Sequence, residues 1–392
     1  MNPSFKGLLA GIGLCGGLYV HATELTIATF NVSMEAENYV AKGSPLGPEV
    51  LAGQLASGKN PQISNIAAIL QQVRPDILLL NEFDYIADPA QGVQQFISQY
   101  LTKPQHGGKP LQYPYFYYQT VNTGQPSGFD LNNDGKVEGA EDAWGFGHYP
   151  GQYGMLVLSR YPIDATKART FQHFKWKDMP GHKETKKADG SAWFSPQAWE
   201  KMPLSSKSHW DLPLSVDGKP LHLLISHPTP PVFDGPENRN GHRNHDEVKF
   251  WVDYLSGNAD YIYDDKGGRG GYQSTAPFIV MGDQNSSPDE GDAHRYAIQA
   301  LVNHPTIQHD PVPQSAGGAA HTPDNPMAKF HTAGWRMRAD YVLPSKHGIK
   351  VNSSGVFWPV KGEPLYEAVA SRGASSDHRL VWVKLSLTDE KK

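Results

Sequence analysis

The stretch that decides the fold is PFIVMGDQNSSP, residues 277–288. Its four apolar residues run directly into Gly282, Asp283, Gln284 and Asn285. A short apolar run that ends in turn residues predicts a buried strand. Such a strand fixes the positions of Asp283 and Asn285, and the loop that follows leaves both side chains reachable for chemistry. The G-D-x-N pattern alone also occurs in ordinary turns, so it needs support from elsewhere in the chain.

A strand–helix–strand unit near the N-terminus gives that support. Residues 25–31 predict a first strand ending at Asn31, and the thirty residues after it, rich in Gly, Pro and Ser, predict a surface loop. Asn60-Pro61 predicts the start of a helix with one apolar stripe. Residues 77–80 predict a second strand that leads into Glu82. If the two strands are parallel, Asn31 and Glu82 lie at the same edge of the sheet.

More polar side chains follow the strands predicted in the C-terminal half of the chain. They are His227 after a hairpin with an Asp-Gly turn, Asp340 on the strand 339–343, and Asp377 and His378 on a small-residue turn. Acid and amide oxygens gathered at one rim suit a hard divalent cation, Mg²⁺, Mn²⁺ or Ca²⁺. Zinc is disfavoured by the absence of an H-E-x-x-H pattern and of cysteine ligands. Histidines with acidic partners suit a phosphoryl oxyanion.

The spacing of these elements predicts the architecture. Thirteen or so short strands with few helices between them predict an α/β fold of two packed sheets with helices outside. The sequence shows no internal repeat, linker or second core, so we expect one domain over residues 23–392. Its excess length lies in insertions at about 120–150 and 164–210. With 35 Lys and Arg against 40 Asp and Glu, the chain lacks the cationic excess of a non-specific duplex binder.

The insertion at about 120–150 contains DLNNDGKVEGAE, residues 130–141. Its spacing matches the twelve-residue loop that binds calcium between two helices. The loop would bind a structural Ca²⁺ through Asp130, Asn132, Asp134, Lys136 and Glu141. The flanking residues do not predict helices, and an Asx-rich turn is the alternative.

Two arginines lie at or just before the start of a predicted helix whose apolar stripe is Val248, Trp251, Val252 and Leu255. Arg239 and Arg243 stand at the wrong end for cations, given the direction of the helix dipole. A bound anion, as part of a substrate, would resolve this conflict. The alternative is an ion pair with Glu237, Asp246 or Glu247.

The N-terminus predicts a targeting signal. Lys6 precedes an apolar stretch over residues 7–20, and small residues follow at the positions that a signal peptidase reads. We therefore expect residues 1–22 to be a cleaved signal peptide and the protein to be secreted or periplasmic. Cys15, the single cysteine, lies inside this segment, so the mature chain would form no disulfide.

The order of these motifs resembles the endonuclease/exonuclease/phosphatase superfamily, the deoxyribonuclease I-like proteins. Any one piece is weak, but the ordered set spans about 350 residues of the chain. The resemblance implies a four-layer sandwich in which two mixed, mostly antiparallel β-sheets pack face to face with helices outside. The matching pieces are Phe30-Asn31, Asn81-Glu82, residues 154–162, 226–228, 282–285 and 339–343, and Ser376–His378.

The resemblance also implies roles for individual residues. Glu82, with Asn31 and Asp377, would hold the catalytic cation. Asp283 would orient or deprotonate the attacking water, which Asn285 would help to position. His378, fixed by Asp340, would contact the scissile phosphate, and His227 would bind a phosphoryl oxygen.

The chain departs from the family pattern at two places. Gln152, with Tyr153 beside it, stands where many nuclease members carry a tyrosine, and we expect Gln152 to contact the substrate. Pro228–Pro231 follows His227 where relatives usually have Leu and a polar loop. We expect substrate choice to be made in this loop and in the residues after it.

The sequence therefore predicts a secreted, divalent-metal-dependent phosphoester hydrolase that acts by in-line attack of activated water. Its partner would be a phosphate ester, with no obligate protein partner and a monomeric state. The alternatives are an extracellular nuclease on DNA or RNA, a sphingomyelinase-like phosphodiesterase, and a non-catalytic calcium-binding module.

Overall fold

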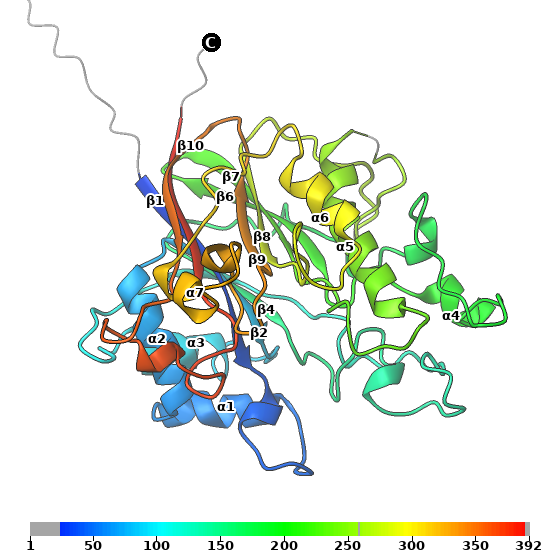
Figure 1. The fold of residues 1–392 in the computed structure, drawn as a ribbon, viewed down its shortest axis with the longest axis horizontal. Helices are drawn as coiled ribbons and strands as arrows, with labels where there is room; N and C mark the ends of the chain where they lie inside the picture. The colour runs from blue at the N-terminus through cyan, green and yellow to red at the C-terminus, as the bar shows by residue number, and fades with distance from the viewer. Residues whose placement is uncertain (1–23, 258, 389–392) are drawn as a thin grey trace, which may run out of the picture.

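The computed structural model describes residues 24–257 and 259–388 (Figure 1). The predicted signal peptide and Cys15 lie outside these residues. Within them, no helix combines the length and the apolar character that crossing a bilayer needs.

Two β-sheets form the centre of the molecule (Figure 1). The six-stranded sheet has the order β10-β11-β1-β2-β4-β3, in which β1 and β2 are parallel and the other neighbours antiparallel. Its strands are β1 (Glu24–Met34), β2 (Ile77–Phe83), β3 (Tyr115–Tyr117), β4 (Met155–Ser159), β10 (Ile349–Val356) and β11 (Val381–Leu387).

The five-stranded sheet has the order β5-β6-β7-β8-β9, in which β7 and β8 are parallel and the other neighbours antiparallel. Its strands are β5 (Arg169–Thr170), β6 (His209–Val216), β7 (Lys219–Ser226), β8 (Phe278–Asp283) and β9 (Asp340–Pro344). The structure thus confirms two mixed, mostly antiparallel sheets, with eleven strands in the described residues rather than thirteen.

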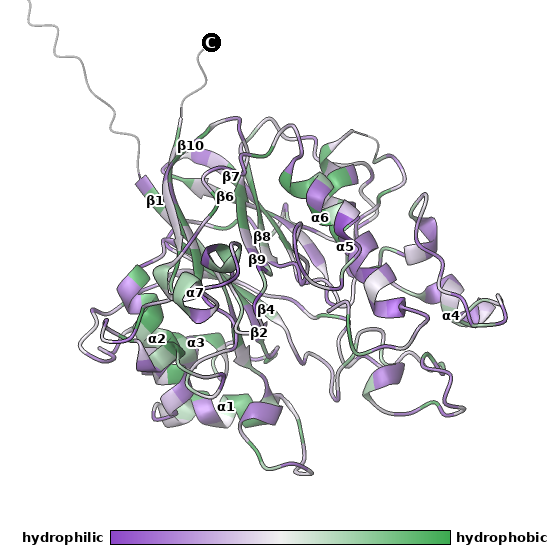
Figure 2. Cartoon of the chain, viewed as in Figure 1, coloured by the Kyte–Doolittle hydropathy of each residue, from purple (hydrophilic) through white to green (hydrophobic). Residues whose placement is uncertain are grey.

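The sheets pack face to face, and helices cover their outer faces. One apolar core joins Leu79 and Val383 of the first sheet to Ile225 and Met281 of the second. Helices α1 (Pro48–Ser57), α2 (Pro61–Val73) and α3 (Val93–Phe96) lie beside the first sheet, and α5 (Arg239–Leu255) and α6 (Arg295–Val302) beside the second (Figure 1). Figure 2 shows apolar residues concentrated in the strands and on α1–α3. Two short helices, α4 (Pro196–Lys201) and α7 (Ala316–His321), lie in the connections.

Helix α2 begins and ends as its sequence predicts. The side chain of Asn60 accepts a hydrogen bond from the backbone N–H of Ile63, Pro61 fills the first helical position, and Arg74 closes the helix in a left-handed conformation. Helix α1, by contrast, lies where the sequence predicts a loop. It buries only Leu51 and Leu55, so it lacks the long apolar stripe that marks a helix in a sequence.

The polar ends of the strands meet where the two sheets join. Asn31 lies opposite Asn81 in the parallel pair β1–β2, and Asp283 lies opposite Asp340 in the pair β8–β9. The side-chain N–H of Asn31 donates to Oδ2 of Asp283 at 3.1 Å and so links the two sheets. The parallel arrangement predicted for β1 and β2 is confirmed, and it brings the strand-end residues into one place.

Candidate active site

Asp283 lies at the centre of the candidate active site, where the polar ends of the strands meet. Its Oδ2 lies 3.4 Å from Nε2 of His227 and 3.5 Å from Nε2 of His378, and its side chain is 1% exposed. Burial alone would raise the pKa of Asp283, but the positive charge of His378 and the hydrogen bond of His227 hold it far below its ordinary value. Asp283 is therefore a carboxylate at any working pH.

The backbone of 282–285 explains why this sequence can present Asp283. Gly282 has a φ of +134°, and a Cβ there would lie 2.1 Å from the carbonyl oxygen of Ser226, so only glycine fits. Asn285 has a φ of +50°. Its N–H donates to Oδ1 of Asp283 at 2.9 Å, and its side-chain N–H donates to the carbonyl of Pro228 at 3.1 Å. The turn thus fixes one carboxylate oxygen and leaves the other for its neighbours.

His378 and Asp340 form a buried pair. Nδ1 of His378 lies 2.9 Å from Oδ2 of Asp340, which also accepts the hydroxyl of Thr332. Burial alone would lower the pKa of His378, but the charges of Asp340 and Asp283 raise it to about 10. The ring of Trp335 meets His378 edge to face at 4.6 Å. His378 is therefore an imidazolium at neutral pH, oriented by Asp340.

His227 has the opposite character. Its Nε2 lies 4.0 Å from Oε1 of Glu82 and 3.4 Å from Asp283, and burial, helped by Lys207, lowers its pKa. Its Nδ1 is buried and has no hydrogen-bond partner among the described residues. His227 is therefore a neutral ring placed between two carboxylates.

The Glu82 side of the site concentrates negative charge. Glu82 has a φ of +57°, a conformation that side chains rarely adopt and that concentrates at functional sites. Burial and then the charge of Glu82 raise the pKa of Glu35 well above its ordinary value, and burial raises that of Asp84 to about 7. One oxygen of Glu35 is buried without a partner. Carboxylates that repel each other in this way fit a bound divalent cation.

The structure groups the candidate ligands in two overlapping sets. Glu82, His227 and Asp283 form one set, and Asp283, Asp340 and His378 form the other, each with ligand atoms within 4.8 Å of one another. Two predicted metal ligands stand at the edge of these sets. The amide of Asn31 contacts Asp283 and the N–H of Ser33, and Asp377 bonds the hydroxyl of Ser33 and Arg372. Their role as ligands stays a prediction.

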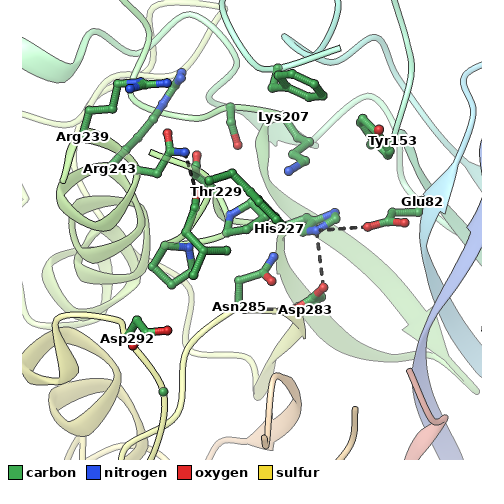
Figure 3. A pocket seen from close by; sticks show the side chains of 18 of the residues that line it. Glu82, Tyr153, Lys207, His227, Thr229, Arg239, Arg243, Asp283, Asn285 and Asp292 are labelled. Carbon is green, nitrogen blue, oxygen red and sulfur yellow. Dashed lines mark hydrogen bonds and ion pairs between the residues drawn. The ribbon is translucent and has the colours of Figure 1, made fainter. Parts of the chain in front are cut away.

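One large pocket adjoins these residues (Figure 3). Its wall includes Glu82, His227, Asp283, Asn285, Asp377 and His378 but not Asn31 or Asp340. Its volume is about 1010 Å³, which is at the upper end of the range for small-molecule sites. Glu82, His227 and Asp283 lie at one end, and Arg239 and Arg243 at the other (Figure 3).

Lys207 is a further candidate site residue in this pocket. It lies two residues before the start of β6, is 5% exposed and lines the pocket. Figure 3 shows its ammonium group directed toward the side occupied by His227 and Glu82. Burial lowers its pKa, and the charges of Glu247 and Glu82 oppose that effect. The backbone carbonyl of Lys207 accepts the N–H of Asn122 at 3.0 Å, whereas its ammonium group makes no hydrogen bond or ion pair within residues 24–257 and 259–388. One lysine among serines gives no sequence pattern that would single it out.

The two arginines line the pocket but already have partners. Arg239 pairs with Glu237, as the sequence alternative has it, and also with Glu141 at 2.9 Å. Arg243 donates to the carbonyls of Leu204 and Pro203 at 2.9 and 3.0 Å. Both arginines are thus fixed at the pocket wall by groups of the protein itself.

Gln152 does not reach the pocket. Its amide donates to Glu37 at 2.9 Å and accepts the N–H of His148 at 2.7 Å, and the residue is fully buried. Tyr153 lines the pocket instead, and its hydroxyl also bonds Glu37. The phenol of Tyr153 therefore lines the pocket one position after Gln152, where many nuclease members carry a tyrosine.

The predicted calcium loop forms a set of local turns. The side chains of Asp130, Asn132 and Asp134 accept the N–H groups of Gly135, Asp134 and Lys136. Glu141 turns to Arg239, and Lys136 pairs with Glu138. No helix of the EF-hand kind flanks the loop in the described residues. Calcium binding here stays a prediction.

The fold and the site together define a phosphoester hydrolase of the two-sheet sandwich class. A model of the endonuclease/exonuclease/phosphatase family matches residues 28–378, so the chain belongs to this family, whose members hydrolyse phosphoesters.

Several solved structures are similar to this chain. An endonuclease/exonuclease/phosphatase from Beutenbergia cavernae DSM 12333 is 14% identical, with a TM-score of 0.50, and the match covers 93% of this chain and 72% of that one. The human Nocturnin catalytic domain with bound sulfate anion is 13% identical, with 93% and 95% covered and a TM-score of 0.46. Sphingomyelinase C from Streptomyces griseocarneus is 14% identical, with 92% and 99% covered and a TM-score of 0.43. No curated protein sequence matches the chain.

Proposed function

We propose that this chain is an exported, divalent-metal-dependent hydrolase of small phosphate esters, in which water attacks phosphorus directly. One observation carries the proposal: a single carboxylate oxygen of Asp283 lies 3.4 Å from Nε2 of His227 and 3.5 Å from Nε2 of His378. Glu82 stands beside this group. A phosphoryl group placed there would meet one charged and one neutral imidazole and a carboxylate able to orient water.

The acidic side of the site would hold the cation. Glu82, with Asp283 and His227 next to it, offers the ligand set, and the mutual repulsion of Glu35, Asp84 and Glu82 fits a positive ion. When bound, such an ion supplies neutralisation of charge on the phosphoryl oxygens.

Side chains of the protein would orient the attacking water and stabilise the charge that develops on the phosphoryl group. Asp283, kept ionised by its histidines, orients the attacking water rather than acting as a strong base, because its pKa is low. The imidazolium of His378 and the ammonium of Lys207 face the negative charge that grows on the phosphoryl oxygens. A bond forms between the water oxygen and phosphorus while the bond from phosphorus to the alcohol oxygen breaks. Of the two protons of the water, one ends on the departing alcohol and the other stays on the phosphate or passes to solvent.

Two finer parts of the proposal rest on sequence patterns. Export rests on the N-terminal pattern of residues 1–22. A structural Ca²⁺ at residues 130–141 rests on the spacing of its acidic side chains.

The test is hydrolysis of p-nitrophenyl phosphate, bis(p-nitrophenyl) phosphate and plasmid DNA, each with and without EDTA. We expect turnover of a small ester that EDTA abolishes and that Asp283→Ala abolishes. Asp260, exposed and outside the pocket, supplies the control Asp260→Ala, which should keep full activity. Full activity of Asp283→Ala would contradict the proposed mechanism, and cleavage of DNA alone would favour the nuclease alternative.

A further inference from the structure

The pocket extends far beyond the residues that would bind a phosphoryl group. At the end where Arg239 and Arg243 stand, its wall is apolar. We call this part the apolar wing; it is lined by Trp176, Phe194, Met202, Val232 and Phe233. The Trp176 ring centroid lies 6.0 Å from the guanidinium carbon of Arg243, which places the wing at the end of the pocket away from Glu82 (Figure 3).

The pocket exposes apolar side chains that a folded protein ordinarily covers. Phe233 in the wing is 86% exposed, and Phe146, which lines the pocket on the side of His148 and Tyr153, is 50% exposed. Trp335, beside His378, is also exposed, so half of the six large apolar side chains exposed in the described residues line this one pocket. Such gathering marks a binding surface rather than scattered surface residues.

The exposure of Phe233 is built into the structure. Its φ is +66°, a conformation that costs free energy in a non-glycine residue. The turn that carries it is fastened to the start of α5: the side-chain N–H of Asn240 donates to the carbonyl of Val232 at 2.7 Å, and its backbone N–H donates to Asp234 at 2.6 Å. Phe233 is thus held outward at the pocket rather than left loose.

The contacts of the two arginines argue against a second anionic group of the ligand. Arg239 is paired with the carboxylates of Glu237 and Glu141. Arg243 keeps its charge, but its Nε and Nη2 groups already donate to the carbonyls of Leu204 and Pro203. A polynucleotide, which needs cations for its further phosphates, does not fit such a wall. An uncharged hydrocarbon does.

We propose that the apolar wing binds the alcohol portion of the substrate, and that the preferred substrate is a phosphate ester of an extended apolar alcohol. This inference rests on the proposed function, since it places the phosphoryl group beside Asp283. The phosphate end would lie on the His227, His378 and Lys207 side, and the hydrocarbon would cover Phe233 and Val232.

The test uses binding and turnover separately. Calorimetry with methylphosphonate and hexylphosphonate, which the enzyme does not hydrolyse, should show tighter binding of the hexyl compound, by about fourfold for each methylene that leaves water. Hydrolysis of methyl and hexyl phosphate should show the same order in kcat/KM. Phe233→Ser should reduce the hexyl-to-methyl ratio in both measurements. Tyr296→Ser, which removes an exposed aromatic residue outside the pocket lining, should keep the ratio.

Two results would overturn the inference: equal binding of the two phosphonates, or a ratio that Phe233→Ser leaves unchanged. Turnover of all esters without a chain-length preference would contradict the binding of the alcohol portion in the apolar wing, while the proposed function would stand. A hexyl preference in binding without hydrolysis of any ester would support the wing and contradict the proposed function.

Discussion

Lys207→Met is the substitution that separates function from stability most clearly. The change removes an ammonium group that lines the pocket and makes no hydrogen bond or ion pair within the described residues. Methionine keeps the length and the apolar stem of the side chain. Because a buried charge without a partner costs free energy, the variant should unfold at the same temperature as the wild type or higher.

Phosphate binding should fall instead. A hydrogen bond to a charged group contributes about 1.5–3 kcal/mol, so the affinity for inorganic phosphate should drop ~10- to ~150-fold. Calorimetric titration with phosphate in the presence of Mg²⁺ measures this, and differential scanning calorimetry measures the stability. Lys207→Arg should retain most of the affinity, and Lys187→Met, an exposed lysine outside the pocket, should retain all of it. Unchanged phosphate affinity in Lys207→Met, or a loss of stability without a loss of affinity, would refute the reasoning.

Three further predictions concern the acid groups. The folded-state pKa of His378 is raised from 6.5 to about 10, so its charge stabilises the fold below about pH 6.5, and this contribution is lost as the pH rises through about 10. Asp340→Asn should therefore cost about 3–5 kcal/mol of unfolding free energy at pH 6, less near pH 10, and move the alkaline limb of the pH–rate profile to lower pH. EDTA should lower the melting temperature, since an ion at 100 times its Kd adds about 2.7 kcal/mol, and Glu82→Gln should remove the part of this response that the active-site ion causes. Asp134→Ala should lower the melting temperature in calcium but leave hydrolysis intact; an unchanged melting point in both calcium and chelator would exclude a structural ion.

The parts of the site that the sequence predicts are those where a strand delivers the residue. Asp283 follows an apolar run and Gly282, whose positive φ favours glycine. One short stretch of sequence therefore predicts the strand, the turn and the position of the carboxylate. Asn31 and Glu82 are predictable for the same reason, since two apolar runs and a capped helix between them imply a parallel pair.

Other parts depend on packing that no local pattern records. Lys207 and Glu35 acquire their character from burial beside distant carboxylates. Gln152 turns away because Glu37 and the N–H of His148 hold its amide. Arg239 pairs with Glu141, ninety-eight positions earlier, because the predicted calcium loop at residues 130–141 packs against the start of α5. Such contacts arise between insertions, where periodicity carries no information about partners.

The central claim is that one divalent cation and one phosphoryl group share the pocket between Glu82 and His378. Anomalous diffraction from crystals soaked with Mn²⁺ and inorganic phosphate tests it directly. The account predicts a manganese peak at the Glu82 carboxylate and phosphate density beside His227 and His378. Manganese bound only elsewhere on the molecule, with no ion at Glu82 at saturating concentration, would contradict it.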